Sequence, residues 1–334
     1  MKSYLIINYH TLKTAWILLC LLGMMRVGYS QDNKKDTISQ HKDTVAMQKD
    51  TASENVELAT DQSIPSGKKP VKNTFSSIWI IDNQTVMVPI KKTFELDIMH
   101  RFGTVGNGYQ DFFGLFASTN IRLGFDYVPI DKLLVGVSLT EYNLAWETYA
   151  KYALIKQTQD GKIPVSATFY TNLAVETKKE GDYPHFSNRL LFFNQLIIAR
   201  KINDKFSVQV APSLTHVNSV QGFYPGDTTA DGKSVVGKEM QHDHFAIAFA
   251  GKWQLTSSMS LIVNIDQPIT KHLTNNPDPN LSLGIDINTS AHSFQIFFGN
   301  YQYITPSRNN YYNHNDYTEG QWLIGFNITR LWNF

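Results

Sequence analysis

QWLIGFNITRLWNF, residues 321–334, alternates between two kinds of side chain. One parity contains the polar or small residues Gln321, Gly325, Asn327 and Asn333, and the other is apolar and aromatic: Trp322, Ile324, Phe326, Ile328, Trp332 and Phe334. Successive side chains of a β-strand point to opposite faces, so this stretch predicts a strand with one aromatic face. Arg330 is the exception near the end, where a long side chain can extend to an interface. Such a strand belongs to a sheet that separates a polar environment from an apolar one.

The same alternation recurs through residues 93–334. It is clear in nine further segments: 94–101, 121–127, 135–140, 165–173, 206–214, 245–253, 261–266, 281–288 and 294–298. Two more segments, 144–155 and 190–201, have the length of a strand and a less regular pattern. Together with the terminal stretch they predict about twelve strands, an even number as in single-chain bacterial outer-membrane barrels.

The connections between these strands fall into two classes. Tight turns are expected at 129–132, 158–162, 202–205, 256–258 and 289–290. Longer connections, rich in Gly, Asn, Tyr and Pro, are expected at 102–119, 177–188, 218–242, 267–280 and 304–319. From a periplasmic N-terminus, every tight turn would lie on the periplasmic side and every long loop outside, with one short outer connection at 141–143. This asymmetry is typical of outer-membrane barrels and not of soluble sandwiches, so residues 93–334 are predicted to form an antiparallel transmembrane β-barrel.

The N-terminal part of the chain predicts export. Residues 1–30 have the basic start, apolar core and small final residues of a signal peptide, and they contain the single cysteine, Cys20. No later apolar run reaches the ~18 residues of a membrane-spanning helix, which leaves a closed barrel as the way to cross a membrane. Residues 31–75 are polar and are predicted to be a disordered periplasmic tether. The formal net charge of +1 does not suggest a nucleic-acid partner.

A seven-residue repeat marks the predicted tether. Lys-Asp-Thr recurs with a small or aliphatic residue after it, which places Thr37, Thr44 and Thr51 in equivalent positions. Asp-Thr followed by a small or aliphatic residue resembles the O-glycosylation sequon of Bacteroidota, so these threonines are candidate glycan sites. A polar linker without modification explains the repeat equally well, and one apolar position per repeat is too few for a coiled coil.

Several longer strings resemble one family of β-barrels. They are HRFG at 100–103, NIRLG at 120–124, QLIIARK at 195–201, DQP at 266–268, RNN at 308–310 and GFNITRLWNF at 325–334. From Trp79 to Phe334 the chain is similar to domain of unknown function 5777, an uncharacterised family of Bacteroidota. The resemblance implies a barrel in the outer membrane, inserted by the barrel assembly machinery and surrounded by lipid. It carries no established activity, so no site residue follows from it.

Charged residues of the inward parity are the candidate site. They would set a field that selects solutes by charge, as at a porin constriction: Glu95, Asp97, Arg101, Arg122, Asp126, Lys252, Asp266 and Asp286, with Glu147 and Lys151 as further candidates. The alternative is that these charges pair and fill a closed interior. Residues 76–92 are a possible plug or docking segment, because the apolar residues of Ser77–Pro89 lie just before the barrel.

Catalytic and metal-binding patterns are weak in this chain. Five histidines lie on different segments without a ligand-like spacing, and Ser293 beside His292 would face the opposite side of a strand. His272 with Ser282 or Asn280 is the remaining hydrolase candidate. We expect no enzyme and no cofactor. Instead we expect a monomeric porin-like channel for small polar solutes; a non-conducting binding or scaffold barrel is the alternative, and an outer-membrane hydrolase is the third hypothesis.

Overall fold

A computed structural model describes residues 69–178, 183–220 and 222–334. The predicted signal peptide, the candidate glycan sites Thr37, Thr44 and Thr51, and the predicted tether up to residue 68 lie outside the described residues. The barrel predicted from residue 93 onward falls almost entirely within them.

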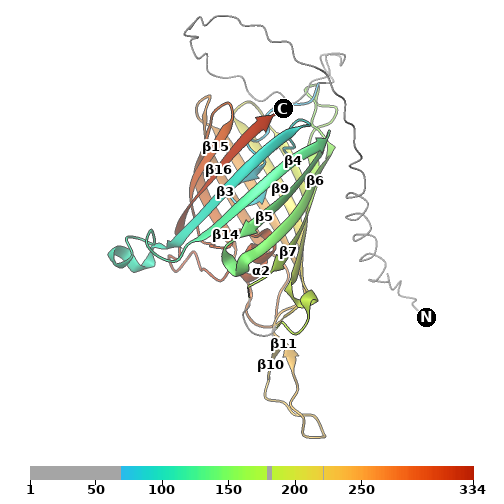
Figure 1. The fold of residues 1–334 in the computed structure, drawn as a ribbon, viewed down its shortest axis with the longest axis vertical. Helices are drawn as coiled ribbons and strands as arrows, with labels where there is room; N and C mark the ends of the chain where they lie inside the picture. The colour runs from blue at the N-terminus through green and yellow to red at the C-terminus, as the bar shows by residue number, and fades with distance from the viewer. Residues whose placement is uncertain (1–68, 179–182, 221) are drawn as a thin grey trace, which may run out of the picture. The chain divides into compact units, whose positions relative to one another are not determined.

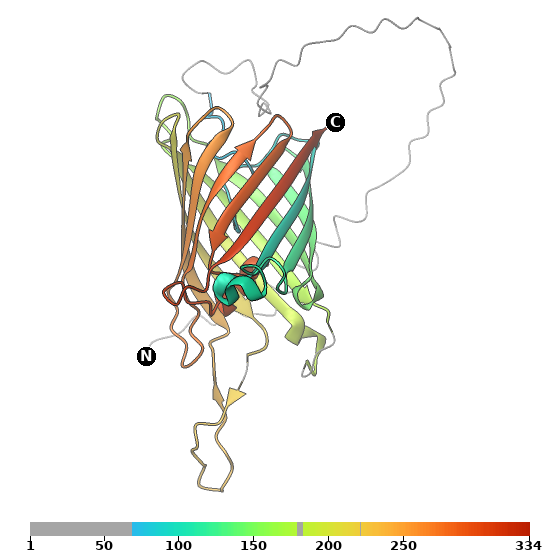
Figure 2. The same ribbon diagram turned by 90° about the vertical axis from the view of Figure 1, so that its left-hand side faces the viewer.

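Twelve antiparallel strands form a closed barrel, which confirms the predicted fold class and strand number (Figures 1 and 2). The strands are β3 (Thr93–Thr104), β4 (Asn120–Ile130), β5 (Leu133–Thr140), β6 (Ala145–Ile155), β7 (Ser166–Glu176), β8 (Leu190–Lys201), β9 (Phe206–Val217), β12 (Asp243–Gln254), β13 (Met259–Pro268), β14 (Asn280–Asn288), β15 (His292–Gly299) and β16 (Leu323–Asn333). Each pairs with its neighbours in chain order, and β16 closes the barrel against β3, with Ile328 opposite Ile98.

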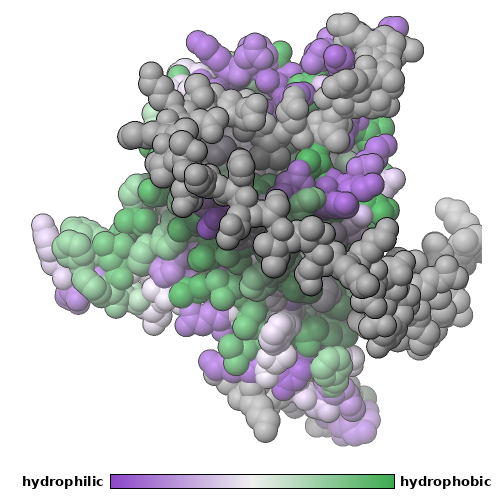
Figure 3. Space-filling view, turned by 45° about the horizontal axis from the view of Figure 1, so that its top comes forward, coloured by the Kyte–Doolittle hydropathy of each residue, from purple (hydrophilic) through white to green (hydrophobic). Residues whose placement is uncertain are grey.

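Alternating burial follows the predicted parity. On β4, Leu123 and Phe125 are 42% and 46% exposed, whereas Arg122 and Asp126 on either side of them are buried. The outward residues form the apolar belt that a barrel in lipid requires, and green patches are visible on the part of the surface that grey atoms leave uncovered in Figure 3. Among the described residues, no helix has the length and apolar character needed to span a membrane.

The irregular pattern of β8 has a structural cause. Phe193 and Ile197 face the barrel interior and are buried, although both are apolar. They belong to an apolar cluster that includes Trp79 and Ile80 of the preceding segment. Part of the interior is therefore dry, and the strand that faces it carries apolar residues on both sides.

The two ends of the barrel differ as the turn lengths predict. The short-turn end carries the connections after β4, β6, β8, β12 and β14. The long-loop end carries the others, among them a 3-10 helix at Val105–Gln110 (η2), a two-stranded extension of β10 (Gly222–Phe223) and β11 (Gly237–Lys238), and α2 (Pro306–Tyr312). In Figure 1 the extension points away from the barrel along its axis. The connection at 141–144, between β5 and β6, is short, as expected.

A small hairpin lies within the barrel. It consists of β1 (Trp79–Ile80) and β2 (Asn83–Gln84), paired antiparallel through Trp79–Gln84 and Ile80–Asn83. Its residues are almost fully buried, although a two-stranded hairpin of this size has no core of its own. The wall of the barrel must therefore supply its partners.

Candidate functional site

Both ends of the hairpin segment lie at the short-turn end of the barrel. Before the hairpin, the Val71 N–H donates to Gln157 O at 2.7 Å, in the connection between β6 and β7. After the hairpin, the Lys92 N–H donates to Val128 O at 2.7 Å, near the turn that follows β4. The chain thus enters the barrel and leaves it through the same opening, and β3 begins immediately afterwards at Thr93.

Polar side chains of the wall bind the backbone of the hairpin. The Gln295 side chain accepts from the Ile81 N–H at 2.9 Å and donates to Trp79 O at 2.9 Å. Asn327 Nδ2 donates to Ile81 O at 2.6 Å, and Gln209 Nε2 donates to Gln84 O at 2.8 Å. An edge strand with unpaired backbone groups is costly to bury, so these side chains replace the neighbouring strand that the hairpin lacks.

Lys151 of β6 is the main cationic partner of the hairpin. Its Nζ donates to Gln84 Oε1 at 2.7 Å, to Thr85 O at 3.1 Å and to Ile78 O at 3.3 Å. An ammonium group can donate three hydrogen bonds, and here all three go to oxygens of the hairpin and its flanking residues. Hydrogen bonds from charged groups are about twice as strong as neutral ones, so Lys151 fixes both strands of the hairpin at one point.

The tip of the hairpin, at Asp82 and Asn83, reaches the deepest polar cluster. Asp82 accepts from the Tyr301 hydroxyl at 2.9 Å, from Asn264 Nδ2 at 2.9 Å and from Asn309 Nδ2 of α2. Asn83 Nδ2 donates to Asp266 Oδ2 at 2.8 Å. The hairpin from one end and α2 from the other therefore meet at the Asp82–Asn309 hydrogen bond, and together they fill the lumen.

An ion pair fixes α2 to the wall. Arg308 Nε donates to Glu176 Oε1 at 2.7 Å, and Arg308 Nη2 donates to the same oxygen. The guanidinium lies 4.6 Å from the ring centre of Tyr312 and 4.8 Å from that of Tyr142. Burial alone would lower the pKa of Arg308, but Glu176 together with the neighbouring Tyr312 and Tyr142 outweighs burial and holds this pKa above its ordinary value. Tyr183 and Asn143 also donate to Glu176, so both oxygens of this carboxylate accept hydrogen bonds.

All eight sequence-predicted lumen residues are buried: Glu95, Asp97, Arg101, Arg122, Asp126, Lys252, Asp266 and Asp286. Three of them touch the hairpin on its apolar side. Asp97 accepts from Trp79 Nε1 at 2.7 Å, the Arg122 guanidinium lies 4.8 Å from the Trp79 ring centre, and Arg101 reaches Ile81 O at 3.5 Å.

The other five residues are distributed over the wall. Asp266 binds the hairpin tip, as described above, and Lys252 reaches Asn73 O at 3.5 Å. Glu95 on β3 lies opposite Asp126 on β4 in the strand register. Asp286 accepts from Ser293 Oγ at 2.8 Å on the neighbouring strand. The eight residues therefore do not form one ring; they surround the hairpin at several depths.

Sequence reasoning missed the amide groups that hold the hairpin. Gln195, Gln209, Asn264, Gln295 and Asn327 all have the inward parity, but none carries a charge and none was singled out. Their recurrence on inward positions of different strands was the available signal. Amides offer a donor and an acceptor on one side chain, which suits the backbone of an unpaired strand.

The histidine and serine candidates for hydrolysis do not converge. His272 accepts from the Gln241 N–H through Nδ1 at 2.9 Å, and its Nε2 lies 2.8 Å from His244 Nδ1. Ser282 Oγ instead donates to Asn264 O at 3.3 Å, and Asn280 donates to Asn309 O at 3.4 Å. Within the described ranges, no group of three or more His, Cys, Asp or Glu residues is arranged to hold a metal ion.

Cavities remain at both ends of the filled lumen. A cavity of about 140 Å³ at the short-turn end borders Glu95, Lys252 and the start of the hairpin. A larger cavity of about 780 Å³ at the long-loop end is lined by Tyr183, Arg308, Tyr311 and Tyr312, among others. The larger one has both aromatic and charged walls and could accommodate a small amphipathic molecule.

The family is shown by a match over residues 75–332 to the membrane-bound β-barrel domain DUF5777. The chain belongs to this family, as the resemblance in the sequence implied, and it is a membrane-bound barrel. No curated protein sequence is significantly similar to it.

Solved structures of channels are similar to the chain at low identity. The NanC porin matches with 9% identity and a TM-score of 0.43, over 72% of this chain and 99% of the porin. An outer-membrane channel from Pseudomonas putida F1 matches with 11% identity and a TM-score of 0.44, over 74% and 97%. The KdgM porin in complex with disordered oligogalacturonate matches with 8% identity and a TM-score of 0.40, over 72% and 99%. With these scores below 0.5, no property of the three channels is transferred to this chain.

Proposed function

We propose that this member of the DUF5777 family is an outer-membrane channel for small polar solutes whose resting state is closed by the segment 77–88, which contains the hairpin of β1 and β2. The short-turn end would face the periplasm and the long-loop end the exterior. The observation that carries the proposal is the route of the hairpin, which enters and leaves through the short-turn end. A segment on such a route can be withdrawn without opening the barrel.

The contacts of the hairpin support a removable plug. Its backbone is bound by side-chain amides and by Lys151, so water could take over each of these hydrogen bonds after withdrawal. The exposed wall would then be a wet lumen lined by charges of both signs, among them Asp97 on β3 and Arg122 on the neighbouring strand β4. Fixed charges that line a narrow lumen select ions by sign.

The test is single-channel conductance of the full chain in planar bilayers, compared with a variant in which a Gly/Ser linker replaces residues 77–88. We expect the full chain to be closed for most of the time and the variant to give stable open steps. Asp97→Asn and Arg122→Gln in the variant should shift its ion selectivity in opposite directions. A variant that folds into a heat-modifiable barrel and stays silent would overturn the proposal.

Lys151→Met provides a finer test in the full chain. The substitution removes three hydrogen bonds to the hairpin, each worth about 1.5–3 kcal/mol for a charged donor, and should raise the open probability. Lys252→Met is the matched control, because Lys252 is buried in the same lumen but reaches Asn73 O at 3.5 Å, before the hairpin. Equal effects of the two substitutions would contradict a specific role of Lys151.

The cavity of about 780 Å³ at the long-loop end favours a second candidate function. A non-conducting barrel could bind an amphipathic ligand between Tyr183 and Tyr312 and present it at the cell surface. In that case the variant without the hairpin would remain silent, and Tyr312→Ala would remove ligand binding in calorimetry without changing the barrel.

A further inference from the structure

The connection between β3 and β4 exposes a group of aromatic side chains. We call residues 105–119 the aromatic loop; it contains η2 and the turn after it. Tyr109 and Phe116 are 84% and 82% exposed, and Phe112 and Phe113 are 51% and 42% exposed. A cluster of large apolar residues in water is unfavourable and marks an interaction surface.

The aromatic loop has a defined conformation. Phe113 N donates to Gly108 O at 2.6 Å, Phe116 N donates to Asp111 O at 3.0 Å, and Gly114 N donates to Asp111 Oδ1 at 2.8 Å. Phe112 and Phe113 have φ angles of 53° and 58°, in the left-handed region that costs of order 1–3 kcal/mol for an ordinary residue. The loop therefore holds its aromatic side chains exposed in a conformation that has an energetic cost.

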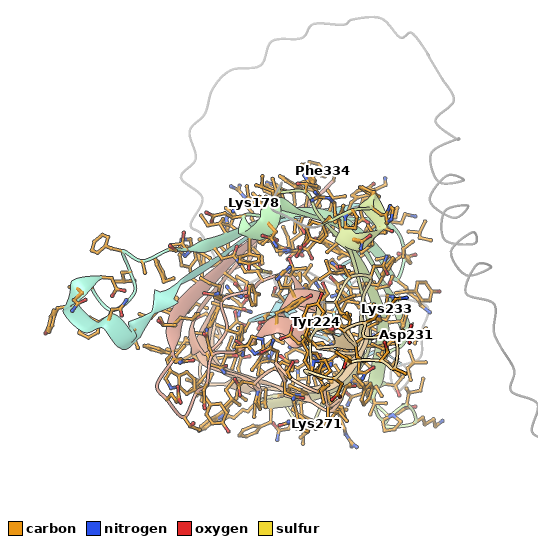
Figure 4. All side chains as sticks on the ribbon, turned by 90° about the horizontal axis from the view of Figure 1, so that it is seen from below. Lys178, Tyr224, Asp231, Lys233, Lys271 and Phe334 are labelled. Atoms are coloured by element: carbon orange, nitrogen blue, oxygen red, sulfur yellow. The ribbon has the colours of Figure 1, made fainter. Side chains whose placement is uncertain are left out.

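The position of the aromatic loop identifies its partner. It leaves the wall at Thr104, beside Phe102 and Phe326, whose rings lie 6.1 Å apart on the outer face of β3 and β16. In Figures 1 and 4 the loop extends sideways from the barrel wall, and it does not project along the axis. Its apolar surface is thus continuous with the belt that faces lipid in a membrane-bound barrel.

The composition of the loop fits a membrane interface. Asp111 is the single charged residue of 105–119, and its carboxylate is bonded within the loop to Gly114 and Asn107. Aromatic rings favour the boundary between lipid headgroups and acyl chains. We propose that the aromatic loop is a lateral anchor that inserts Tyr109, Phe112, Phe113 and Phe116 into the lipid leaflet at the long-loop end.

A single-cysteine fluorescence experiment tests this proposal. Cys20 is the only cysteine of the chain, so Phe116→Cys in a Cys20→Ser background gives one labelling site for an environment-sensitive dye. The full chain is reconstituted in phosphatidylcholine vesicles with or without lipid that carries a nitroxide near the headgroup. Tyr224→Cys is the matched control, because Tyr224 is 72% exposed in the loop that projects along the barrel axis.

We expect the dye at position 116 to emit at shorter wavelength than at position 224 and to lose most of its emission to the nitroxide lipid. The dye at 224 should be quenched by iodide in water and not by the lipid. Equal iodide quenching at both positions would overturn the proposal. Energy transfer between labelled copies at 116, without lipid quenching, would also overturn it and would assign the loop to contact with a second copy of the chain.

Discussion

At the scale of single residues, the guanidinium of Arg122 connects the barrel wall to the hairpin. It donates to Glu147 at 3.2 Å and lies 3.9 Å from Asp97, with the Trp79 ring against its face. Removing one partner of a buried ion pair costs about 3–5 kcal/mol, because the other charge stays buried without compensation. The stabilisation that Arg122 provides therefore depends on all three partners together and not on a single contact.

Arg122→Met should destabilise the barrel by about 3–5 kcal/mol for this reason. In the double variant Arg122→Met/Glu147→Gln the uncompensated carboxylate is gone, so part of that loss should be recovered. Urea unfolding of the single and double variants in lipid vesicles measures the difference. Losses that simply add would show that Arg122 and Glu147 act independently, contrary to their contact in the structure.

At the scale of secondary structure, the alternation of inward and outward side chains determines which face of each strand contacts lipid. Phe249 lies in the middle of β12 and is 50% exposed on the outer face, so it should face the centre of the bilayer. Phe249→Arg should impair folding into bilayers, because an arginine there costs about 2–4 kcal/mol. The heat-dependent shift of the barrel in gel electrophoresis reports folding, and Phe249→Leu is the control. A normal shift for the arginine variant would contradict the assigned face.

The connection between β13 and β14 should respond to pH through His272. Burial lowers the pKa of His272 below its ordinary value near 6.5. Its Nδ1 accepts from the Gln241 N–H, so a proton on that nitrogen would face another donor. Because the folded pKa is lower than the unfolded one, the stabilisation by neutral His272 is complete above about pH 6.5 and is lost as pH falls below it.

Hydrogen exchange of the Gln241 amide measures this effect. We expect faster exchange relative to the barrel strands as pH is lowered from 7 to 5, after correction for the intrinsic rate. His272→Asn should flatten the pH dependence, since an asparagine oxygen accepts at both pH values. An unchanged profile in that variant would assign the effect to another group, of which His244 is the nearest, at 2.8 Å.

The molecule as a whole shows what the sequence could and could not predict. Alternation along β4 and β12 predicted the wall, because a period of two leaves one choice of face once lipid covers one side. The segment 76–92 was predicted as a plug or docking segment, and its hairpin lies in the barrel interior, but its partners were not predictable. Ile81 and Gln295 are 214 residues apart, and no local pattern records such a contact.

Helix α2 was missed for a related reason. Its seven residues are too few for a helical period, although Pro306 after Thr305 is a signal for a helix start. The loop was expected to be an outer surface segment with aromatic and amide groups. Its inward position depends on Glu176, which lies 132 residues earlier in the chain and neutralises Arg308. Ion pairs between residues so far apart in the chain cannot be predicted from short stretches of sequence.

The route of the hairpin also sets how the barrel would respond to mechanical force. A pull on Lys69 away from the short-turn end would load the contacts near Val71 first, then those of Ile78 and finally those of the tip at Asp82. Bonds that break one after another resist less than bonds that must break together. Traction from that side would therefore peel the hairpin out at a low peak force, whereas a load shared by all of these contacts at once would meet a higher resistance.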